Sequence, residues 1–440
     1  MEKRVRIIGA GLAGCEAAWQ LAEKGYRTEL YEMKPLKRSP AHHSDGYAEL
    51  VCSNSLKNND ITNACGLLKQ ELRMLGSLIM ECADSSKVEA GAALAVDREV
   101  FSRRVTERIK GHPNIKVYNE VAERVFAEDC IVATGPLTDE KLVGSISGLT
   151  GEGFLYFYDA SAPIVTKESV DFGRAFYGSR YGKGSADYIN CPMSKEEYRN
   201  FYNELIKAER VKIKDFEKRE IFEGCMPVEI MAGRGEDTLR FGPMKPVGLN
   251  DPVKGTRNYA VVQLRKENIS DEMYNLVGFQ TNLTFSEQKR VFGMIPALKE
   301  AEFVRYGVMH RNMFICSPKL LDGSYRLRGS KDIYFAGQIS GVEGYVESVA
   351  SGMTAALAYA YRKERGEGLD FPEDTMTGAL AKYISSADPE DFQPMNSNFA
   401  ILPPFAENIK DKSARKSAYA ERALKSMNKF IKERFEDVRR

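Results

Sequence analysis

The segment from Val5 to Glu32 holds a strand, a glycine-rich turn, a helix and a second strand that ends in an acid. Val5 to Ile8 is a short apolar β-run, Cys15 to Ala22 has the pattern of a helix, and Thr28 to Tyr31 is the next strand. The turn between the first strand and the helix is Gly9-Ala10-Gly11-Leu12-Ala13-Gly14. Its first glycine permits a tight turn, its second lets a pyrophosphate approach the backbone, and its third lets helix and strand pack closely. The sequence therefore predicts a Rossmann-like dinucleotide-binding unit.

Glu32 closes this unit, directly after the second strand. An acid at this position is placed to accept hydrogen bonds from ribose hydroxyls, while the helix N-terminus faces the phosphates. A G-x-G-x-x-G motif alone is a weak signal, because a glycine turn can serve packing only. The flanking strands and the terminal acid favour dinucleotide binding, with the six turn residues and Glu32 as cofactor ligands.

Two later segments decide between FAD and NAD. Asp129 to Pro136 is an apolar strand that ends in Ala-Thr-Gly at Gly135, a feature typical of two-dinucleotide-binding flavoproteins. Ile333 to Gln338 is another buried-type strand, which runs through Gly344 into a small-residue helix over Ser348 to Ala360. In such flavoproteins the last strand and helix start face the flavin. These segments predict FAD, with Gly135, Gly337, Gln338 and Gly344 as further ligands.

A nucleotide-binding domain that starts at residue 5 and finishes beyond residue 330 must be interrupted by an insertion. We expect an α/β fold with a discontinuous Rossmann-like FAD-binding domain, a parallel sheet with helices on both faces, over 1–164 and 301–440. An inserted α/β domain is expected over 165–300, with a helix over Glu196 to Glu220 and strands over Asn258 to Leu264 and Tyr274 to Phe279.

The charge balance limits how the chain could bind nucleic acid. Lys and Arg number 63 against 62 Asp and Glu, so any nucleic-acid partner must be met by a local patch. From Phe405 to Arg440 there are eleven basic and six acidic residues, a net charge of +5 on a helical pattern. This tail is either a solvated terminal helix or a surface that contacts phosphates.

Eight cysteines are scattered without a C-x-x-C pair. This argues against a zinc ribbon, a thioredoxin-type dithiol and a disulfide framework, and it favours a reducing cytosol. No apolar run approaches the ~20 residues of a membrane span. We therefore expect a soluble, cytoplasmic protein.

Two of the cysteines stand in segments with unusual chemistry. Cys52 lies in a stretch from Ala41 to Leu56 that also contains two histidines, an acid and Ser-Asn-Ser. Cys225 lies between a glycine and Met226-Pro227, which cannot be a helix interior. Each of the two could be either a reactive thiol or a small buried hydrophobic residue. The second reading is the one expected for Cys15, Cys82, Cys130 and Cys316. No third ligand has suitable spacing from the histidines, so no metal site is predicted.

Several motifs taken together closely resemble one family, from about residue 4 to beyond residue 400. They are the glycine loop, AHHSDGYAELVCSNSL, GAALAVDR, GCMPVE, RFGPMKPVGL, GFQTNL and FAGQISGVEGYVES. The family is that of the folate- and FAD-dependent tRNA (uracil-5-)-methyltransferases, which make ribothymidine at uridine 54 of the T-loop. The Ala41–Leu56 stretch and GCMPVE separate it from the related wobble-uridine modification flavoproteins.

The resemblance implies methyl transfer without S-adenosylmethionine. Methylenetetrahydrofolate would supply the one-carbon unit, and NADPH or NADH would reduce FAD, which carries the methylene and returns a hydride. Carbon 5 of uracil is a poor nucleophile until a group adds to carbon 6, and a thiolate suits that addition. A base must then remove the carbon-5 proton before the thiol leaves.

The resemblance also implies roles for three residues. Cys225 is the candidate carbon-6 nucleophile, and Cys52 is the second catalytic thiol near the flavin, as base for the carbon-5 proton or as guard of a reactive adduct. Which role each thiol takes stays open. His310 matches a segment near the folate site and could stack on the pterin. The expected partners are the T-arm of tRNA, the folate and NADPH or NADH.

Three other classes of protein are alternatives to this family. A disulfide reductase would share the FAD fold, but it needs a close cysteine pair, and Cys52 and Cys65 are too widely separated along the chain to form one. The same folate and FAD chemistry on a uridine of 23S rRNA would use identical catalytic motifs. A non-enzymatic RNA-binding flavoprotein would be expected to lack Cys52 or Cys225, and both are present.

Overall fold

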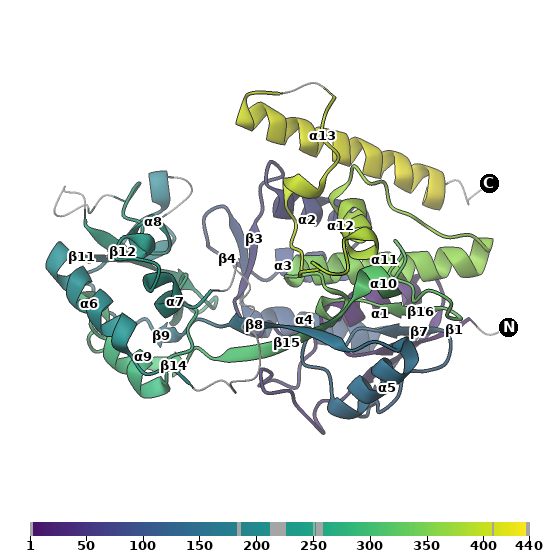
Figure 1. The fold of residues 1–440 in the computed structure, drawn as a ribbon, viewed down its shortest axis with the longest axis horizontal. Helices are drawn as coiled ribbons and strands as arrows, with labels where there is room; N and C mark the ends of the chain where they lie inside the picture. The colour runs from purple at the N-terminus through teal and green to yellow at the C-terminus, as the bar shows by residue number, and fades with distance from the viewer. Residues whose placement is uncertain are drawn as a thin grey trace.

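The computed structural model has two lobes joined by a long two-stranded ribbon (Figure 1). It describes residues 3–182, 186–211, 226–249, 251, 258–406 and 409–436. The larger lobe contains both ends of the described chain, and the smaller lobe is built from its middle. The ribbon pairs β8 (Phe154–Ala160) with β15 (Met309–Ile315) in antiparallel register.

The larger lobe is built on a five-stranded sheet in which every pairing is parallel. Its strand order is β16 (Ile333–Phe335), β7 (Cys130–Val132), β1 (Arg4–Ile8), β2 (Arg27–Glu32) and β6 (Ile115–Asn119). Ile7 in the centre pairs with Leu30 on one side and Ile131 on the other, and all three are fully buried. This central apolar strand is what the sequence predicts, and the Rossmann-like fold class is confirmed.

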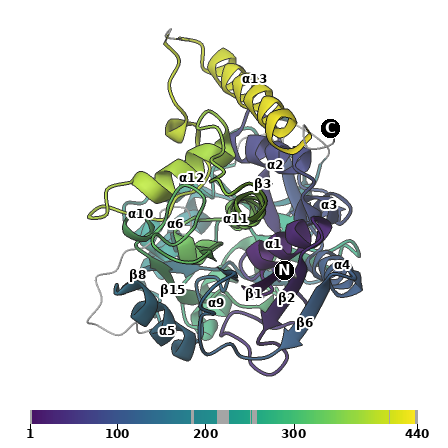
Figure 2. The same cartoon turned by 90° about the vertical axis from the view of Figure 1, so that its right-hand side faces the viewer.

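Helices cover both faces of this sheet (Figure 2). On one face α1 (Leu12–Glu23) packs against α11 (Tyr345–Arg365), and on the other lies α5 (Glu140–Thr150). Further helices extend the first layer: α2 (Ala64–Met74), α3 (Leu78–Asp84), α4 (Arg98–Gly111), α10 (Ser317–Leu320), α12 (Met376–Ser386) and α13 (Lys412–Ile431). A small sheet of β3 (Ser55–Asn58), β5 (Ala93–Val96) and β4 (Lys87–Val88) lies toward the smaller lobe.

The smaller lobe, here called the inserted module, is built on a six-stranded antiparallel sheet with its own hydrophobic core. Its strand order is β10 (Phe176–Tyr177), β11 (Tyr188–Met193), β12 (Ala260–Lys266), β13 (Met273–Leu276), β9 (Ile164–Thr166) and β14 (Phe303–Arg305). Its helices are α6 (Lys195–Lys207), α7 (Val228–Ala232), α8 (Thr238–Phe241) and α9 (Phe285–Phe292). The domain limits 1–164, 165–300 and 301–440 stay a prediction.

The helix expected over Glu196 to Glu220 is too long. α6 begins with a capping box at Ser194 and ends at Lys207, because Ala208 turns to extended backbone and Arg210 then pairs as an isolated bridge with Leu283. The rest of that prediction, from residue 212 on, lies outside the described residues. The helix was predicted too long because the charged, amphipathic pattern of the sequence continues past Lys207, where α6 ends.

Candidate functional site

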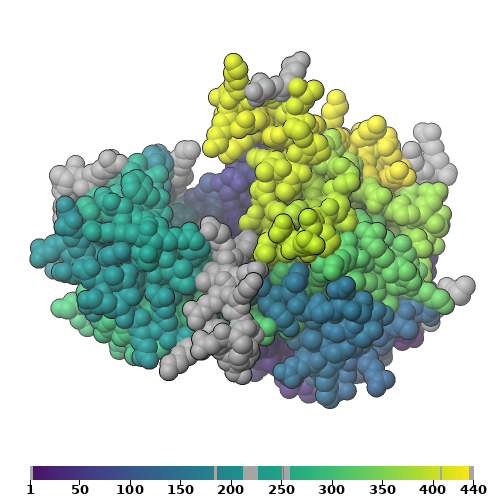
Figure 3. All heavy atoms as spheres, viewed as in Figure 1, coloured from purple at the N-terminus to yellow at the C-terminus, as the bar shows by residue number. Residues whose placement is uncertain are grey.

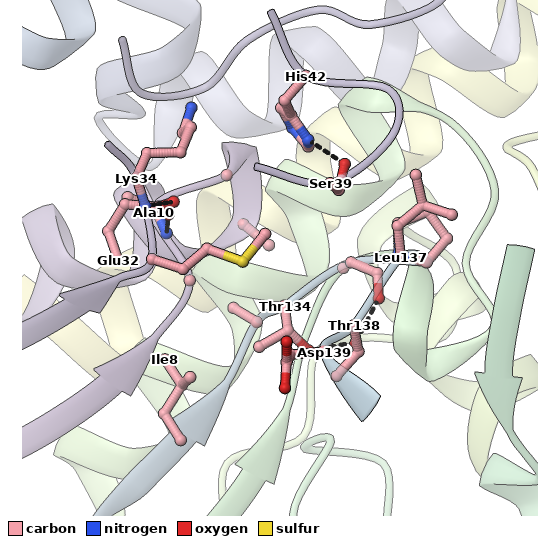
Figure 4. A pocket seen from close by; sticks show the side chains of 18 of the residues that line it. Ile8, Ala10, Glu32, Lys34, Ser39, His42, Thr134, Leu137, Thr138 and Asp139 are labelled. Carbon is pink, nitrogen blue, oxygen red and sulfur yellow. Dashed lines mark hydrogen bonds between the residues drawn. The ribbon is translucent and has the colours of Figure 1, made fainter. Parts of the chain in front are cut away.

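A pocket opens where the strands of the parallel sheet end (Figure 4). Its volume is about 1130 Å³, counted out to its open mouth. Nine of the eleven predicted cofactor residues line it: Gly9, Ala10, Gly11, Leu12, Ala13, Glu32, Gly135, Gly337 and Gln338. Gly14 and Gly344 are not among its lining residues.

The glycine turn leaves room for a ligand at one position and for none at another. Gly9 has a φ of +101°, and a Cβ on Gly14 would lie 1.8 Å from the Gly9 carbonyl oxygen. A Cβ on Gly11 would instead meet nothing within 4 Å among the atoms that the structure describes. Within the same described part, α1 has no side-chain cap at Gly11 and no acid in its first turn. Its free amide end and the open space at Gly11 fit a pyrophosphate.

Glu32 lies at the end of β2, where its carboxylate faces the turn (Figure 4). Its Oε2 accepts a hydrogen bond from the Ala10 N–H at 2.7 Å, and its Oε1 accepts one from the Lys34 N–H at 3.0 Å. The side chain is buried yet lines the pocket. These two bonds fix the carboxylate beside the turn, and its contact with a ribose stays a prediction.

The segments from β7 and β16 complete the pocket from the other side. Gly135 follows β7 and Gly337 follows β16, and both line the same cavity as the turn. The Gly337 N–H donates to Ser351 Oγ of α11 at 2.7 Å, which holds this end of β16 against the helix. Gly344 is the N-cap residue of α11, where a Cβ would lie 2.2 Å from the Glu347 carboxylate.

Cys52 lies beside this pocket, in a segment without helix or strand. Its N–H donates to the hydroxyl oxygen of Tyr345 at 2.8 Å, and both Tyr345 and the neighbouring Val51 line the pocket. Its thiol donates to the Ala160 carbonyl, with sulfur and oxygen 3.7 Å apart. Burial, reinforced by the charge of Asp159, raises the pKa of the Cys52 thiol well above its usual range. The group is therefore a protonated thiol at neutral pH.

Glu343 belongs to the same surroundings, and sequence reasoning did not single it out. Burial, and next the charge of Asp159, raise the pKa of its carboxyl to about 8. The Gln338 side-chain amide donates to Glu343 Oε2 at 2.8 Å. Only its place in the FAGQISGVEGYVES motif could have drawn attention to it, because a glutamate near a helix start is ordinarily exposed.

His310 lies on β15, opposite Asp159 of β8 in the ribbon. It is half-buried, and burial is the main cause that lowers its pKa, followed by the charges of Arg305, His43 and His42. Its pairing partner Asp159 directly precedes Ala160, which accepts the Cys52 thiol hydrogen bond. The ribbon thus brings the predicted folate residue toward Cys52, and His42 lines the FAD pocket itself.

Cys225 lies outside the described residues. The next residue that the structure describes is Met226, which is buried. Two residues further on, the Val228 N–H donates to the Gln280 carbonyl at 2.7 Å. The described cysteines are free thiols, and those other than Cys52 are buried: Cys15, Cys65, Cys82, Cys130, Cys191 and Cys316.

Within the described residues, no group of three or more His, Cys, Asp or Glu side chains is arranged to hold a metal ion. None of the helices in the described part of the chain combines the length and the apolar character needed to cross a membrane.

The fold and the pocket define the class of the protein. A parallel sheet carries the G-x-G-x-x-G turn and the strand-end acid, and the segments after β7 and β16 line the same pocket. This arrangement is that of a Rossmann-like FAD-binding protein. A model of the family described as glucose inhibited division protein A matches residues 4–367. The solved structure of Aquifex aeolicus GidA in its form II crystal superposes with a TM-score of 0.66 at 14% identity, covering 97% of this chain and 73% of that chain.

Curated relatives narrow the class further. The methylenetetrahydrofolate--tRNA-(uracil-5-)-methyltransferase TrmFO of Acetivibrio thermocellus is 57% identical over 428 residues, which are 97% of this chain and 98% of that protein. The protein of the same name from Listeria monocytogenes is 53% identical over 433 residues, 98% of this chain and 100% of that protein. The chain belongs to the TrmFO family, within the broader GidA family.

Proposed function

We propose that the protein methylates carbon 5 of uridine 54 in the T-loop of tRNA, with methylenetetrahydrofolate as the one-carbon donor. The observation that carries this proposal is the placement of Cys52 against the FAD pocket, where Tyr345 lines the pocket and also accepts the Cys52 N–H. Relatives that are 53% and 57% identical over nearly the full chain are named for transfer to uracil carbon 5 of tRNA.

The cofactor is bound by the residues of the turn and by the strand ends. The α1 amides and the space at Gly11 receive the pyrophosphate, Glu32 accepts from the ribose, and Gly337 and Gln338 line the flavin side. When bound and reduced by NADPH or NADH, FAD supplies the hydride and carries the one-carbon unit. The open site at Gly11 is the feature of this chain that fits such a group best.

The two thiols have separate tasks in this proposal. Cys225 adds to carbon 6 of uracil, since a soft thiolate both attacks and leaves readily. Burial favours the protonated thiol of Cys52, so it can take up the carbon-5 proton only as a thiolate, after a neighbouring base has accepted its own proton. Glu343, whose carboxyl pKa is raised to about 8, is a neighbouring group that exchanges a proton near neutral pH.

His310 is proposed to contact the folate. It is half-buried, its lowered pKa keeps the imidazole neutral at pH 7, and the ribbon places it opposite Asp159 and next to the Cys52 contact at Ala160. A neutral ring of this kind can stack on a pterin without the cost of a buried charge.

The reaction is tested by mass spectrometry of RNA after incubation with the folate donor and NADPH. We expect 5-methyluridine in tRNA at position 54 and none in rRNA treated in parallel. The rRNA alternative is not favoured, because the relatives are named for tRNA. The proposal would be contradicted if the rRNA were methylated while the tRNA stayed unmodified. A reaction without the folate is the matched control.

The basic tail is proposed as part of the tRNA-binding surface. α13 lies along the top of the larger lobe (Figure 3), where Ala423, Met427 and Phe430 are buried. The helix is therefore packed on one face, and deletion beyond residue 410 would damage the core. Its exposed basic residues include Arg415, Lys425 and Lys429.

Replacing Arg415, Lys425 and Lys429 together with alanine is expected to weaken tRNA binding and its salt dependence. Each lost phosphate contact lowers the slope of log K against log salt by ~0.7–0.9, so the slope should fall by about 2 to 3. Filter binding over a salt series measures it. The matched control replaces three exposed basic residues of α6, Lys195, Arg199 and Lys207. An equal loss of slope in both triple variants would refute the placement on α13.

A further inference from the structure

The backbone on either side of Cys52 is fixed from the larger lobe by two side chains. The Tyr345 hydroxyl oxygen accepts the N–H groups of Cys52 at 2.8 Å and of Ser53 at 3.1 Å. The Arg98 guanidinium donates to the Cys52 carbonyl at 3.2 Å and to the Leu50 carbonyl at 2.9 Å. Because the segment has no regular secondary structure, such side-chain contacts decide where its thiol lies.

The inserted module holds the same segment from the other side. Arg265 of β12 donates from Nη2 to Ser53 Oγ at 2.7 Å and from Nε to Asn54 Oδ1 at 3.0 Å. The Asn54 amide nitrogen in turn donates to the Lys266 carbonyl at 2.9 Å. Asn54 is fully buried and Arg265 is 8% exposed, so water does not compete freely for these bonds.

Glu267 joins the two sets of contacts. Its Oε2 and Oε1 accept from Arg98 Nε at 2.9 Å and Nη2 at 3.2 Å, and the same Nη2 donates to the Cys52 carbonyl. The side chain of Glu267 is 3% exposed and that of Arg98 is 14% exposed. Because the guanidinium is planar and rigid, Arg98 cannot move with Glu267 without changing its hydrogen bond to the Cys52 carbonyl. A displacement of the end of β12 therefore reaches the Cys52 carbonyl through Arg98.

We propose that Arg265 and Glu267 of the inserted module are positioning residues for the Cys52 thiol, so that the module sets the geometry of a group in the larger lobe. The inference rests on the proposed function only in taking Cys52 as catalytic. A misplacement of about 1 Å in a catalytic constellation can lower the rate about 100-fold. The positive charge of Arg98 lowers the pKa of the Cys52 thiol, whereas burial raises it. The orientation of Arg98 therefore affects the reactivity of the thiol as well as its position.

The test measures the alkylation rate of Cys52 in the full-length, FAD-loaded protein. Iodoacetamide labelling from pH 7 to pH 10, read by peptide mass spectrometry, gives the rate and its pH profile, with the buried Cys316 as internal reference. The variants are Glu267→Gln, which keeps the side-chain shape, and Arg265→Met. The matched control is Arg290→Met, which breaks the ion pairs of Arg290 with Glu204 and Glu287 on the module.

We expect both variants to change the Cys52 alkylation rate at least tenfold and to shift its pH profile, with FAD content and Cys316 labelling unchanged. Turnover should fall about 10- to 100-fold while KM for tRNA stays within threefold, and Arg265→Lys should recover part of the loss. The Arg290→Met control should match the wild type.

Two results would overturn the positioning role. One is a pH profile of Cys52 alkylation in Glu267→Gln that matches the profile of the wild type. The other is a parallel rise of Cys316 labelling, which would mean general loosening of the fold. Failure of the proposed catalytic role of Cys52 has a different signature, since Cys52→Ala would then keep full turnover while the alkylation result in the positioning variants still stands.

Discussion

Cys225→Ala is expected to abolish both ribothymidine formation and the covalent complex with 5-fluorouracil-containing tRNA. If this thiolate attacks carbon 6, fluorine at carbon 5 cannot leave as a cation, so the adduct stalls and shifts on a denaturing gel. FAD should stay bound at wild-type levels, because the pocket is lined by the Gly9 turn and by the segments after β7 and β16. Gel shift, FAD absorbance and 5-methyluridine analysis measure the three quantities.

Cys52→Ala is the matched variant and should behave differently. Turnover is lost, yet some carbon-6 addition persists, because removing the proton-accepting group leaves the attacking thiolate in place. Serine at position 52 is a useful second variant, since its hydroxyl can still donate to the Ala160 carbonyl and so preserves the contact that the thiol makes.

Other outcomes would reassign the thiols. Adduct formation by Cys225→Ala together with its loss in Cys52→Ala would exchange the two roles. Loss of the adduct in both variants would show that the thiols act as one unit, whose single substitutions cannot be added or apportioned.

The parts of the site that the sequence predicts are those encoded by short-range signals. The Gly9–Gly14 turn, Glu32 and the strands around them lie close together in the sequence, and each has a steric or hydrogen-bonding reason visible from spacing alone. The structure brings the turn, Glu32, Gly135 and Gly337 to one pocket, although their segments are far apart along the chain. Parallel strands must end at the same edge of a sheet, which is why this convergence was predictable.

The parts that the sequence does not predict depend on packing between distant segments. The pKa of Glu343 is raised because its carboxyl is buried and because Asp159 of the ribbon adds a negative charge nearby. Neither cause is visible in the motif that contains Glu343. The contact of Arg265 with Ser53 joins two segments that nothing in the sequence places side by side. Gly344, expected among the cofactor ligands by its motif, is the N-cap residue of α11, and its contact with the cofactor stays a prediction. Spacing identifies a motif, but it does not show how each of its members is placed in the fold.

Gly14→Ala and Gly11→Ala are expected to separate folding of the turn from binding of the cofactor. The Cβ of an alanine at position 14 would lie 1.8 Å from the Gly9 carbonyl oxygen, a backbone atom that cannot move aside without opening the turn. Overpacking costs about 1–3 kcal/mol and occasionally more, so Gly14→Ala should lower the thermal midpoint and lose FAD together.

Gly11→Ala should instead keep the fold and lose the cofactor. Its backbone, at φ −74° and ψ −170°, is one that alanine adopts without strain, and the Cβ meets no described atom within 4 Å. The methyl group would occupy the space into which the pyrophosphate must come, so FAD affinity should fall at least tenfold while the midpoint of the FAD-free protein stays within about 2 °C of wild type. Flavin fluorescence titration and thermal melts of the FAD-free proteins measure both. Wild-type FAD affinity in a folded Gly11→Ala protein would show that the phosphates do not approach α1 at this point.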